Sequence, residues 1–309
     1  MELRHLRYFI AVAEEGSVTL AAEKRLFTSQ PSLSRQLRDL EDEIGTALLE
    51  RSARGVALTA AGQAFLPHAR LVLAQVDAAA EAARRAAQPA KARFALGFLT
   101  GQEMDWLPAA MNLLREQLPQ LDVSVTSEYS PHLAELLARG KLDAAFMRAE
   151  DGTNLAYAAI AREPLIAALP SDHPLAERET LALQDIAAEP FIAMSATAPT
   201  LRRLIDDYLS ENRIAPHVVQ EVDNLAMAMS MIASLRAVAI LPAYATNFMP
   251  WSVTGKALSG KVPTIDLVLG YNPANRSPIL GSFLEKLGKL QRPGVLQNTK
   301  GSQITGFPS

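Results

Sequence analysis

The sequence predicts a multidomain α+β protein: an N-terminal helical domain with a short hairpin, one long helix, and a larger C-terminal α/β domain. Three observations predict this order. Residues 16–62 contain two helix-length segments, followed by a strand-length segment that turns at Arg54-Gly55. Residues 59–88 keep an apolar repeat with alternating spacings of three and four. From residue 93 onward, apolar strand-length runs alternate with amphipathic helical segments, as in α/β domains.

The second helix of the N-terminal domain has an apolar face and a polar face. Its apolar stripe follows helical spacing and consists of Leu33, Leu37, Leu40 and Ile44. At about 100° per residue, the opposite face carries Pro31, Arg35 and Arg38, with Ser34 on its flank. Thr28 or Ser29 can cap this helix, and Pro31 suits its first turn. An outward Ser/Arg face suits the DNA major groove, where Arg pairs with guanine and Gln with adenine.

The segment after this helix decides between two interpretations of the leucine stripe. The stripe alone favours an ordinary surface helix whose arginines are merely solvated. However, residues 47–59 run from apolar to basic and back to alternating apolar residues, with Arg54-Gly55 at the expected turn. Such a hairpin presents Arg51 and Arg54 to phosphates or to the minor groove. Helix, turn, helix and basic hairpin together predict a winged helix-turn-helix.

The predicted DNA contacts come from this helix and the hairpin. They are Thr28, Ser29, Gln30, Pro31, Ser32, Ser34, Arg35, Arg38, Arg51 and Arg54. The net charge of −3 is unusual for a DNA-binding protein, but the acids of this domain gather at Glu14, Glu15 and 39–43, away from the expected contact face. One copy neutralises few phosphates, so we expect binding to depend on a second copy of the domain.

Residues 59–88 are expected to form the helix that brings two copies together. Thr59 can cap it, and Pro67 should bend it or remove one backbone hydrogen bond. The apolar repeat predicts a self-pairing seam, which consists of Leu66, Ala69, Leu73, Val76, Ala80 and Ala83. The alternative is a helix that packs on its own domain. Residues 89–92 are then expected to form a hinge.

The C-terminal part contains two successive series of alternating strands and helices. The predicted strands are 93–99, 121–129, 143–148, 164–170, 191–195, 217–222, 237–242 and 264–271. The predicted helices are 107–117, 133–139, 201–212, 225–235 and 279–290. This alternation indicates parallel sheets with helices on their faces.

The ends of these strands predict where a ligand binds. In open parallel sheets, ligands bind at the carboxyl ends of strands and at helix N-termini. Polar groups follow several strands at these points, and the predicted effector contacts are Thr100, Gly101, Gln102, Ser130, Met147, Arg148, Ser195, Thr197, Pro199 and Thr200. Apolar walls are expected from Phe98, Trp106, Phe146, Met147 and Phe248.

Arg148 gives the sharpest hypothesis about the ligand. Arginine binds carboxylates bidentately, so Arg148 is a candidate partner for a ligand carboxylate. The alternative is a structural ion pair with Asp105, Glu150 or Asp151. Thr100 and Ser130 also have an alternative role, as caps of the helices that follow them.

Composition excludes several classes of protein. Zero cysteines exclude disulfides, thiol redox sensing and cysteine–zinc sites. No run of about 18 apolar residues predicts a membrane span, and the start has no signal-peptide pattern, so we expect a cytoplasmic protein. The five histidines are scattered without metal-ligand spacing, and no Ser-His-Asp order, HExxH or phosphate loop is present. We therefore expect neither an enzyme nor a cofactor.

The first 62 residues resemble the LysR-type transcriptional regulators, a large bacterial family. The matching positions are A-A, S-Q-P-S-L-S-R-Q-L, L-E, G, L-L-x-R and L-T-x-A-G, and the resemblance continues to about residue 290. It implies a winged helix-turn-helix at 1–58, a linker helix at 59–88 and a hinge at 89–92. An effector domain like the periplasmic binding proteins follows at 93–291, and a flexible tail at 292–309. Its subdomains would be 93–163 with 266–291, and 164–265.

The resemblance also implies partners and an effector class. The partners are double-stranded promoter DNA, a small carboxylate effector, RNA polymerase, and further copies of the chain in a dimer or tetramer, with no membrane. Segments 146–148 and 247–267 resemble the aromatic-acid-responsive members, such as the activators of phenylpropionate dioxygenase genes. This implies a regulator of a catabolic operon that senses an aromatic carboxylate. A regulator that responds to a non-aromatic metabolite or anion is the alternative, and an enzyme on a binding-protein-like fold is another.

Four positions carry further implications of this resemblance, and two of them depart from the pattern of the family. Some of them bind a second aromatic acid at a deeper site, which the resemblance places at Arg148 and Arg162. Gly101 stands where many of them carry Ser, so a hydroxyl is lost and Gln102 is expected to compensate. Arg236 stands at a helix end where members usually carry Gly, so this helix must end by another route.

Overall fold

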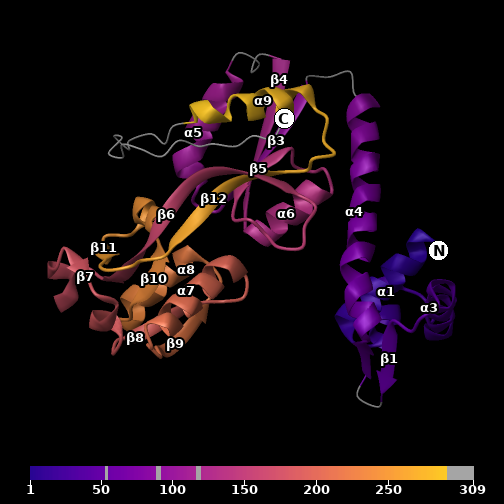
Figure 1. The fold of residues 1–309 in the computed structure, drawn as a ribbon, viewed down its shortest axis with the longest axis horizontal. Coiled ribbons are helices and arrows are strands. Elements are labelled where there is room, and N and C mark those ends of the chain that lie inside the picture. Colours follow the sequence, from indigo (N-terminus) through magenta and orange to yellow (C-terminus); the bar gives the residue numbers. More distant parts are fainter. Residues whose placement is uncertain (53–54, 88–91, 116–119, 291–309) are drawn as a thin grey trace.

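The computed structural model describes residues 1–52, 55–87, 92–115 and 120–290. A small N-terminal domain lies at one end of the long helix α4 (Ala60–Ala87), and a larger two-lobed α/β domain lies beside the other end (Figure 1). This arrangement confirms the predicted class, an N-terminal helix-turn-helix followed by a long helix and an α/β domain.

The N-terminal domain contains the predicted helix-turn-helix and hairpin. Its elements are α1 (Leu3–Glu15), α2 (Val18–Leu20), the π-helical segment η1 (Ala21–Leu26), α3 (Gln30–Ile44), β1 (Leu49–Ser52) and β2 (Gly55–Leu58). Leu33, Leu37 and Leu40 of α3 are buried against α1, as the apolar stripe predicts. Ile44, the fourth member of that stripe, is 36% exposed, because it is the last residue of the helix.

The hairpin is held against the loop after α1 by backbone contacts. β1 and β2 pair antiparallel, with Ser52 opposite Gly55. The Val56 N–H donates to the carbonyl of Gly16 at 2.8 Å. Gly55 has φ of +126°, and a Cβ atom there would lie 2.7 Å from the same carbonyl oxygen. The Arg54-Gly55 pair therefore includes a glycine that this close approach requires.

Helix α4 packs against the N-terminal domain of its own chain along one face. Thr59 caps it as predicted, since its Oγ1 accepts from the Gly62 N–H at 2.9 Å. Ala69 is 1% exposed in the core of the N-terminal domain, and Leu66 and Leu73 pack against that core. The predicted seam is therefore wrong at Ala69, which is covered by its own chain and cannot meet a partner.

The other faces of α4 have different surroundings. Ala78 lies 3.4 Å from the position that a Cβ of Gly140 would take, at the end of α6 (Ser130–Ala138), and Asp77 pairs with Arg139 at 3.7 Å. The face opposite α6 remains open: Val72 is 43% exposed, and Ala79, Ala80 and Ala83 are exposed as well. The apolar repeat thus packs against the helix's own domain near its start and leaves an exposed apolar face further along.

The α/β domain consists of two lobes joined by two long strands. In lobe I, β3 (Ala92–Leu99) lies between β4 (Leu121–Glu128) and β5 (Ala144–Met147), all parallel. Helices α5 (Glu103–Leu114), α6 and α9 (Pro278–Glu285) pack around this sheet, followed by the short 3-10 segment η6 (Leu287–Lys289). β12 (Thr264–Tyr271) pairs antiparallel with β5 and with β6 (Ala156–Pro170).

Strand β6 continues from lobe I into lobe II. Up to Pro164 it pairs with β12, and from Leu165 onward it pairs with β10 (Ala239–Pro242) and β11 (Val253–Leu258). β8 (Pro190–Met194) pairs parallel with β9 (His217–Val222). Helices α7 (Pro199–Glu211) and α8 (Leu225–Leu235) pack on these strands. The remaining elements of lobe II are β7 (Thr180–Leu181), η3 (Pro174–Glu177), η4 (Leu183–Ile186) and η5 (Ala243–Phe248).

Two expectations about this domain need correction. The sheet is mixed rather than parallel, because β12 and β6 run against their neighbours as they cross between the lobes. The predicted strand 164–170 is only the second half of β6. In its first half, buried and exposed residues do not alternate clearly, so the sequence gives little sign of a strand there.

Helix α8 ends at Arg236, which has φ of +51°. An arginine thus takes the left-handed position usually held by glycine, and its side chain pairs with Asp172 at 2.9 Å.

Within the described residues, no helix is long and apolar enough to cross a membrane.

Candidate functional site

The start of helix α3 forms an exposed polar surface. Ser29, Gln30, Pro31, Ser32, Arg35 and Arg38 are exposed, and Thr28 is half-buried. Ser29 is the N-cap position, but its side chain makes no cap hydrogen bond, so the hydroxyl remains available to a partner. Arg35 forms no ion pair with any residue that the structure describes, which leaves its guanidinium open to DNA bases.

Ser34 does not belong to this surface. It is 4% exposed, and its Oγ accepts from the Gln30 side-chain amide at 3.1 Å. The Arg38 Nε donates to the Ser34 carbonyl at 3.3 Å, so the serine orients its neighbours from inside the domain. In the hairpin, Arg51 lies in β1, and nothing is described of its side chain. Arg54 lies outside the described residues.

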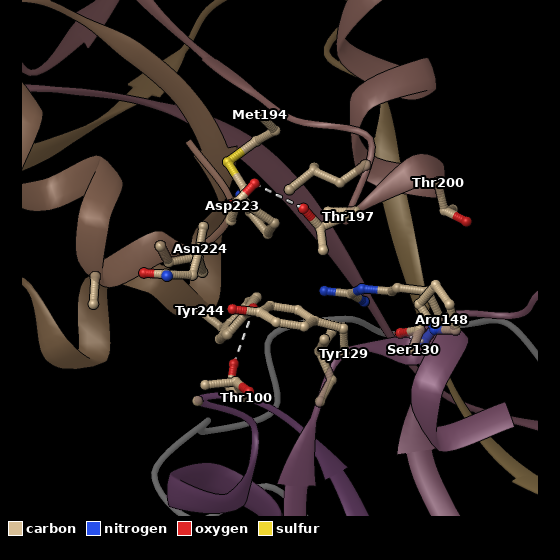
Figure 2. A pocket seen from close by; sticks show the side chains of 18 of the residues that line it. Thr100, Tyr129, Ser130, Arg148, Met194, Thr197, Thr200, Asp223, Asn224 and Tyr244 are labelled. Atoms are coloured by element: carbon tan, nitrogen blue, oxygen red, sulfur yellow. Dashed lines mark hydrogen bonds between the residues drawn. The ribbon is translucent and has the colours of Figure 1, made fainter. Parts of the chain in front are cut away.

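A cavity of about 460 Å³ lies between the two lobes (Figure 2). Lobe I supplies the ends of β3, β4 and β5, as the strand-end rule predicts. Of the predicted contacts, the cavity is lined by Thr100, Gly101, Ser130, Arg148, Thr197, Pro199 and Thr200. The walls are mainly apolar, and they include Met104, Met194, Leu201 and Phe248.

Arg148 is buried at the base of this cavity and is only partly satisfied. One terminal nitrogen, Nη2, donates to Glu163 Oε2 at 2.7 Å, and both side chains are about 5% exposed. The other terminal nitrogen, Nη1, is buried without a hydrogen-bond partner among the described residues. Figure 2 shows the guanidinium extending toward the middle of the cavity. Because a buried N–H is costly to leave unpaired, this group is suited to an acceptor on a ligand.

This arrangement combines the two interpretations of Arg148. A structural ion pair does exist, but its partner is Glu163 rather than Asp105, Glu150 or Asp151. The guanidinium also lies 5.7 Å from the ring centroid of Tyr244, which fixes its plane. Arg148 therefore keeps one donor for the cavity while the other holds the side chain in place.

The hydroxyls near Arg148 are not helix caps. Ser130 Oγ accepts from the Arg148 N–H at 2.9 Å, and Thr100 Oγ1 accepts from Ser127 Oγ at 3.4 Å. The N-cap residues of α6 and α5 are Tyr129 and Gln102, neither of which makes a side-chain cap hydrogen bond. Neither hydroxyl oxygen therefore caps a helix N-terminus, and each hydroxyl, which accepts through its oxygen, keeps its hydrogen to donate.

Several residues that were predicted for this site do not line the cavity. Met147 is fully buried in the core of lobe I, because alternate residues of β5 point to opposite faces of the sheet. Phe98, Phe146 and Trp106 stack in the same lobe. Ser195 is turned toward Asp223. The side chain of Arg162 is 70% exposed and pairs with Asp266 at 2.7 Å, so Arg162 does not reach the buried Arg148 site.

Gln102 does not replace the hydroxyl missing at position 101. It is fully buried, and its amide nitrogen donates to both oxygens of Glu163 at 3.2 Å. Gly101 has φ of +93°, and a Cβ there would lie 2.8 Å from Phe248 and 3.1 Å from Tyr244. The two aromatic rings thus occupy the space that a serine side chain would need.

Contacts between the lobes surround the cavity. The Tyr244 hydroxyl donates to the Thr100 carbonyl at 3.3 Å, and the Asn247 amide donates to Asp105 at 2.8 Å. Arg203 pairs with Asp151 at 3.4 Å, and Thr200 donates to the Ala149 carbonyl at 3.5 Å. The Tyr129 hydroxyl also interacts with the Asn224 side chain. The two lobes are thus close enough for one small ligand to contact both.

Sequence reasoning missed the residues at the ends of β9 and β10. Asp223 and Asn224 follow β9, and Tyr244 follows β10 at Pro242. The strand-end rule applies to them as well as to β3, β4 and β5, so the signal was present. Glu150, two residues beyond Arg148, also lines the cavity. Burial, reinforced by Asp151, raises the pKa of Glu150 to about 7, although Arg203 acts in the opposite direction.

Comparison with known proteins identifies both parts of the chain. Residues 3–63 match the family described as "Bacterial regulatory helix-turn-helix protein, lysR family", and residues 87–291 match the "LysR substrate binding domain". The Hca operon transcriptional activator HcaR of Escherichia coli (strain K12) is 34% identical over 286 residues, which cover 92% of this chain and 96% of that relative.

Solved structures agree with this match. The crystal structure of CbnR, a LysR family transcriptional regulator, aligns with a TM-score of 0.56 and 28% identity, covering 93% of this chain and 100% of that one. Full-length CbnR complexed with its target DNA aligns with a TM-score of 0.54 and 28% identity, covering 94% and 99%.

Proposed function

The chain belongs to the LysR family and is a DNA-binding transcriptional regulator, and we propose that its effector is a small aromatic carboxylate and that it controls a catabolic operon. The relatives are regulators, and this chain is likewise a regulator rather than an enzyme. The observation that carries the effector proposal is the unpaired Nη1 of Arg148, buried in the cavity between the lobes.

The shape and chemistry of the cavity support an aromatic acid. A volume of about 460 Å³ lies in the range of small-molecule sites and accommodates one ring with a short side chain. Arg148 Nη1, with the hydroxyls of Thr100 and Ser130, forms a cluster of donors on lobe I. Tyr244, Phe248 and Met104 supply an apolar wall for the ring.

We propose that the effector acts by changing the angle between the lobes. A ligand shifts such an equilibrium only if it binds one arrangement more tightly, and this cavity takes residues from both lobes. Helix α6 begins at the cavity with Ser130 and ends against α4 near Gly140, which links the effector site to the helix of the DNA-binding domain.

We propose that the DNA-binding unit is a pair of chains joined through the open face of α4. This face carries Val72, Val76, Ala79 and Ala83, which follow helical spacing. Two copies of α3 would then read the two halves of a palindromic site. The same surfaces are compatible with a tetramer, and recruitment of RNA polymerase would complete the regulatory role.

The proposal is tested by footprinting the purified chain on the DNA upstream of its own gene, with and without arylcarboxylates, beside calorimetry of the same acids. We expect micromolar binding of an arylalkanoic acid and a changed footprint at saturation. If simple anions or non-aromatic metabolites bind and aromatic acids do not, the effector class is wrong. Unaltered binding of the effector by Arg148→Ala would remove Arg148 from the site.

A further inference from the structure

The lobe II wall of the cavity carries a carboxylate of its own. Asp223 Oδ1 accepts from Ser195 Oγ at 2.6 Å and from Thr197 Oγ1 at 3.0 Å. Figure 2 shows Asp223 and Thr197 together on the side of the cavity away from Ser130. These two hydrogen bonds hold the pKa of Asp223 below its usual value, so the group is ionised at neutral pH.

This contact changes what the hydroxyls of lobe II offer a ligand. A hydroxyl has one hydrogen to donate, and those of Ser195 and Thr197 are used within this cluster, on Asp223 and on each other. They are therefore not free to bind a ligand carboxylate. The second oxygen, Oδ2, accepts from no residue in the described part of the chain, and it is available to a donor.

The two walls of the cavity thus have opposite requirements. Lobe I presents Arg148 Nη1, a cationic donor that needs an anionic acceptor. Lobe II presents Asp223, an anionic acceptor that needs a donor. Glu103 and Glu150 also line the cavity, so a second carboxylate on the ligand would meet like charges.

We propose that this cavity selects a monocarboxylate that carries a hydrogen-bond donor, a hydroxyl or an ammonium group, at its far end, and that Asp223 sets this specificity. The inference rests on the proposed function and specifies the effector further. The carboxylate lies against Arg148, the ring lies between Tyr244 and Met104, and the donor lies against Asp223. Dicarboxylates are rejected, because their second charge faces Asp223.

The test is calorimetry of the full chain with four para-substituted 3-phenylpropionates, at pH 7.5 and one ionic strength. The substituents are methyl, hydroxyl, aminomethyl and carboxyl, which give no donor, a neutral donor, a cationic donor and a second anion. We expect the hydroxyl and aminomethyl compounds to bind at least tenfold more tightly than the methyl compound. We expect the carboxyl compound to bind at least tenfold more weakly than the methyl compound.

Asp223→Asn gives the decisive comparison, because it removes the charge and keeps the size. This variant should bring the carboxyl compound within about threefold of the methyl compound and remove the advantage of the aminomethyl compound. Asp207→Asn is the matched control, since Asp207 is an exposed acid on α7 that does not line the cavity. Asp223 is exposed, so thermal unfolding should show both variants folded.

The outcomes separate this inference from the proposed function. If the methyl compound binds and the four affinities are alike, or if Asp223→Asn leaves their order unchanged, the role of Asp223 is wrong and the carboxylate effector stands. If the dicarboxylate binds most tightly, the inference is likewise wrong. If none of the four binds to the folded chain, the aromatic-carboxylate proposal fails with it.

Discussion

Arg148 and Glu163 form a buried ion pair, 2.7 Å between Nη2 and Oε2, directly behind the cavity between the lobes. The side-chain amide of Gln102 also holds Glu163 in place, because it donates to both of its carboxylate oxygens. Glu163 sits at the point where β6 passes from one lobe to the other. The residue proposed to bind the effector is therefore tied directly to the strand that joins the lobes.

Glu163→Gln should make the chain less stable and more dependent on its effector. Removing one partner of a buried ion pair costs about 3–5 kcal/mol, because the other charge is left uncompensated. A bound carboxylate would then supply an anionic partner in place of the one that Arg148 has lost. We expect a lower melting temperature than in the parent, and a larger rise on adding effector. Asp266→Asn removes an exposed pair and should do neither. An effector-induced rise no larger than that of the parent would contradict this account.

Effector binding should weaken as the pH rises through about 7, because Glu150 ionises in the cavity. The pKa of this carboxyl is raised to about 7 from an ordinary value of 4.5. Because the pKa of Glu150 is higher in the folded chain than in the unfolded chain, the protonated carboxyl contributes to the stability of the fold. This contribution is full below pH 4.5 and is lost as the pH rises through about 7. At pH 8.5, Glu150→Gln should therefore be more stable than the parent by about 1 kcal/mol, after allowance for solvent screening.

Thermal unfolding and calorimetry at pH 5.5 and 8.5 check this prediction. The affinity of the parent for the effector should fall between the two values, and that of Glu150→Gln should change much less. Glu285→Gln on α9 is the control, since this acid is exposed and far from the cavity. A parent and a Glu150→Gln variant with the same pH dependence would show that Glu150 does not carry it.

Arg35→Ala should lose sequence-specific DNA binding while the domain stays folded. Arg35 is exposed on α3 and forms no ion pair with the described residues, so its removal leaves no buried group unsatisfied. A bidentate contact to guanine contributes about 1–3 kcal/mol, which corresponds to a loss of about fivefold to 150-fold in affinity. Gel-shift titration on specific and scrambled duplexes measures it. Arg178→Ala in lobe II is the control. Equal affinity of Arg35→Ala and the parent for the specific duplex would exclude a role in base reading.

Val72→Asp should separate the paired chains without unfolding the N-terminal domain. Val72 is 43% exposed on the open face of α4, and a carboxylate there would be buried in the proposed seam. Sedimentation should show a smaller species than the parent. The affinity for DNA should fall, because the two DNA-binding domains that read the two half-sites are no longer joined. Arg70→Ala, on a different face of the same helix, should keep the parent's size. An unchanged assembly in Val72→Asp would place the seam elsewhere.

Gly101→Ser should reduce both stability and effector affinity. The added Cβ would approach Phe248 to 2.8 Å at a backbone φ of +93°. Overpacking and left-handed strain each cost about 1–3 kcal/mol. Gly281→Ser on α9 meets no atom within 4 Å and is the matched control. Gly101→Ser with Phe248→Ala should recover part of the loss, and a failure to do so would show that Phe248 is not the obstacle.

Periodicity, spacing and motifs were enough to predict the family, the class of fold and most elements. The leucine stripe of α3, the Thr59 cap and the strands β3, β4, β5, β8, β9, β10 and β12 are local patterns, which follow from periodicity and propensity. The sequence did not predict β7, β11 or the first half of β6. The ends of the parallel strands also placed Thr100, Ser130, Arg148 and Thr197 in one cavity, because a shared sheet edge brings them together.

Which polar groups are already satisfied depends on contacts between distant parts of the chain. Nothing local in the sequence pairs Arg148 with Glu163, turns Ser195 toward Asp223, or covers Ala69 with the rest of its domain. Each of these contacts joins residues from separate segments of the chain, and their partners are set by packing. A residue type and its position on an element predict a possible donor or acceptor. Whether that group remains open to a ligand or a partner depends on what the fold brings against it.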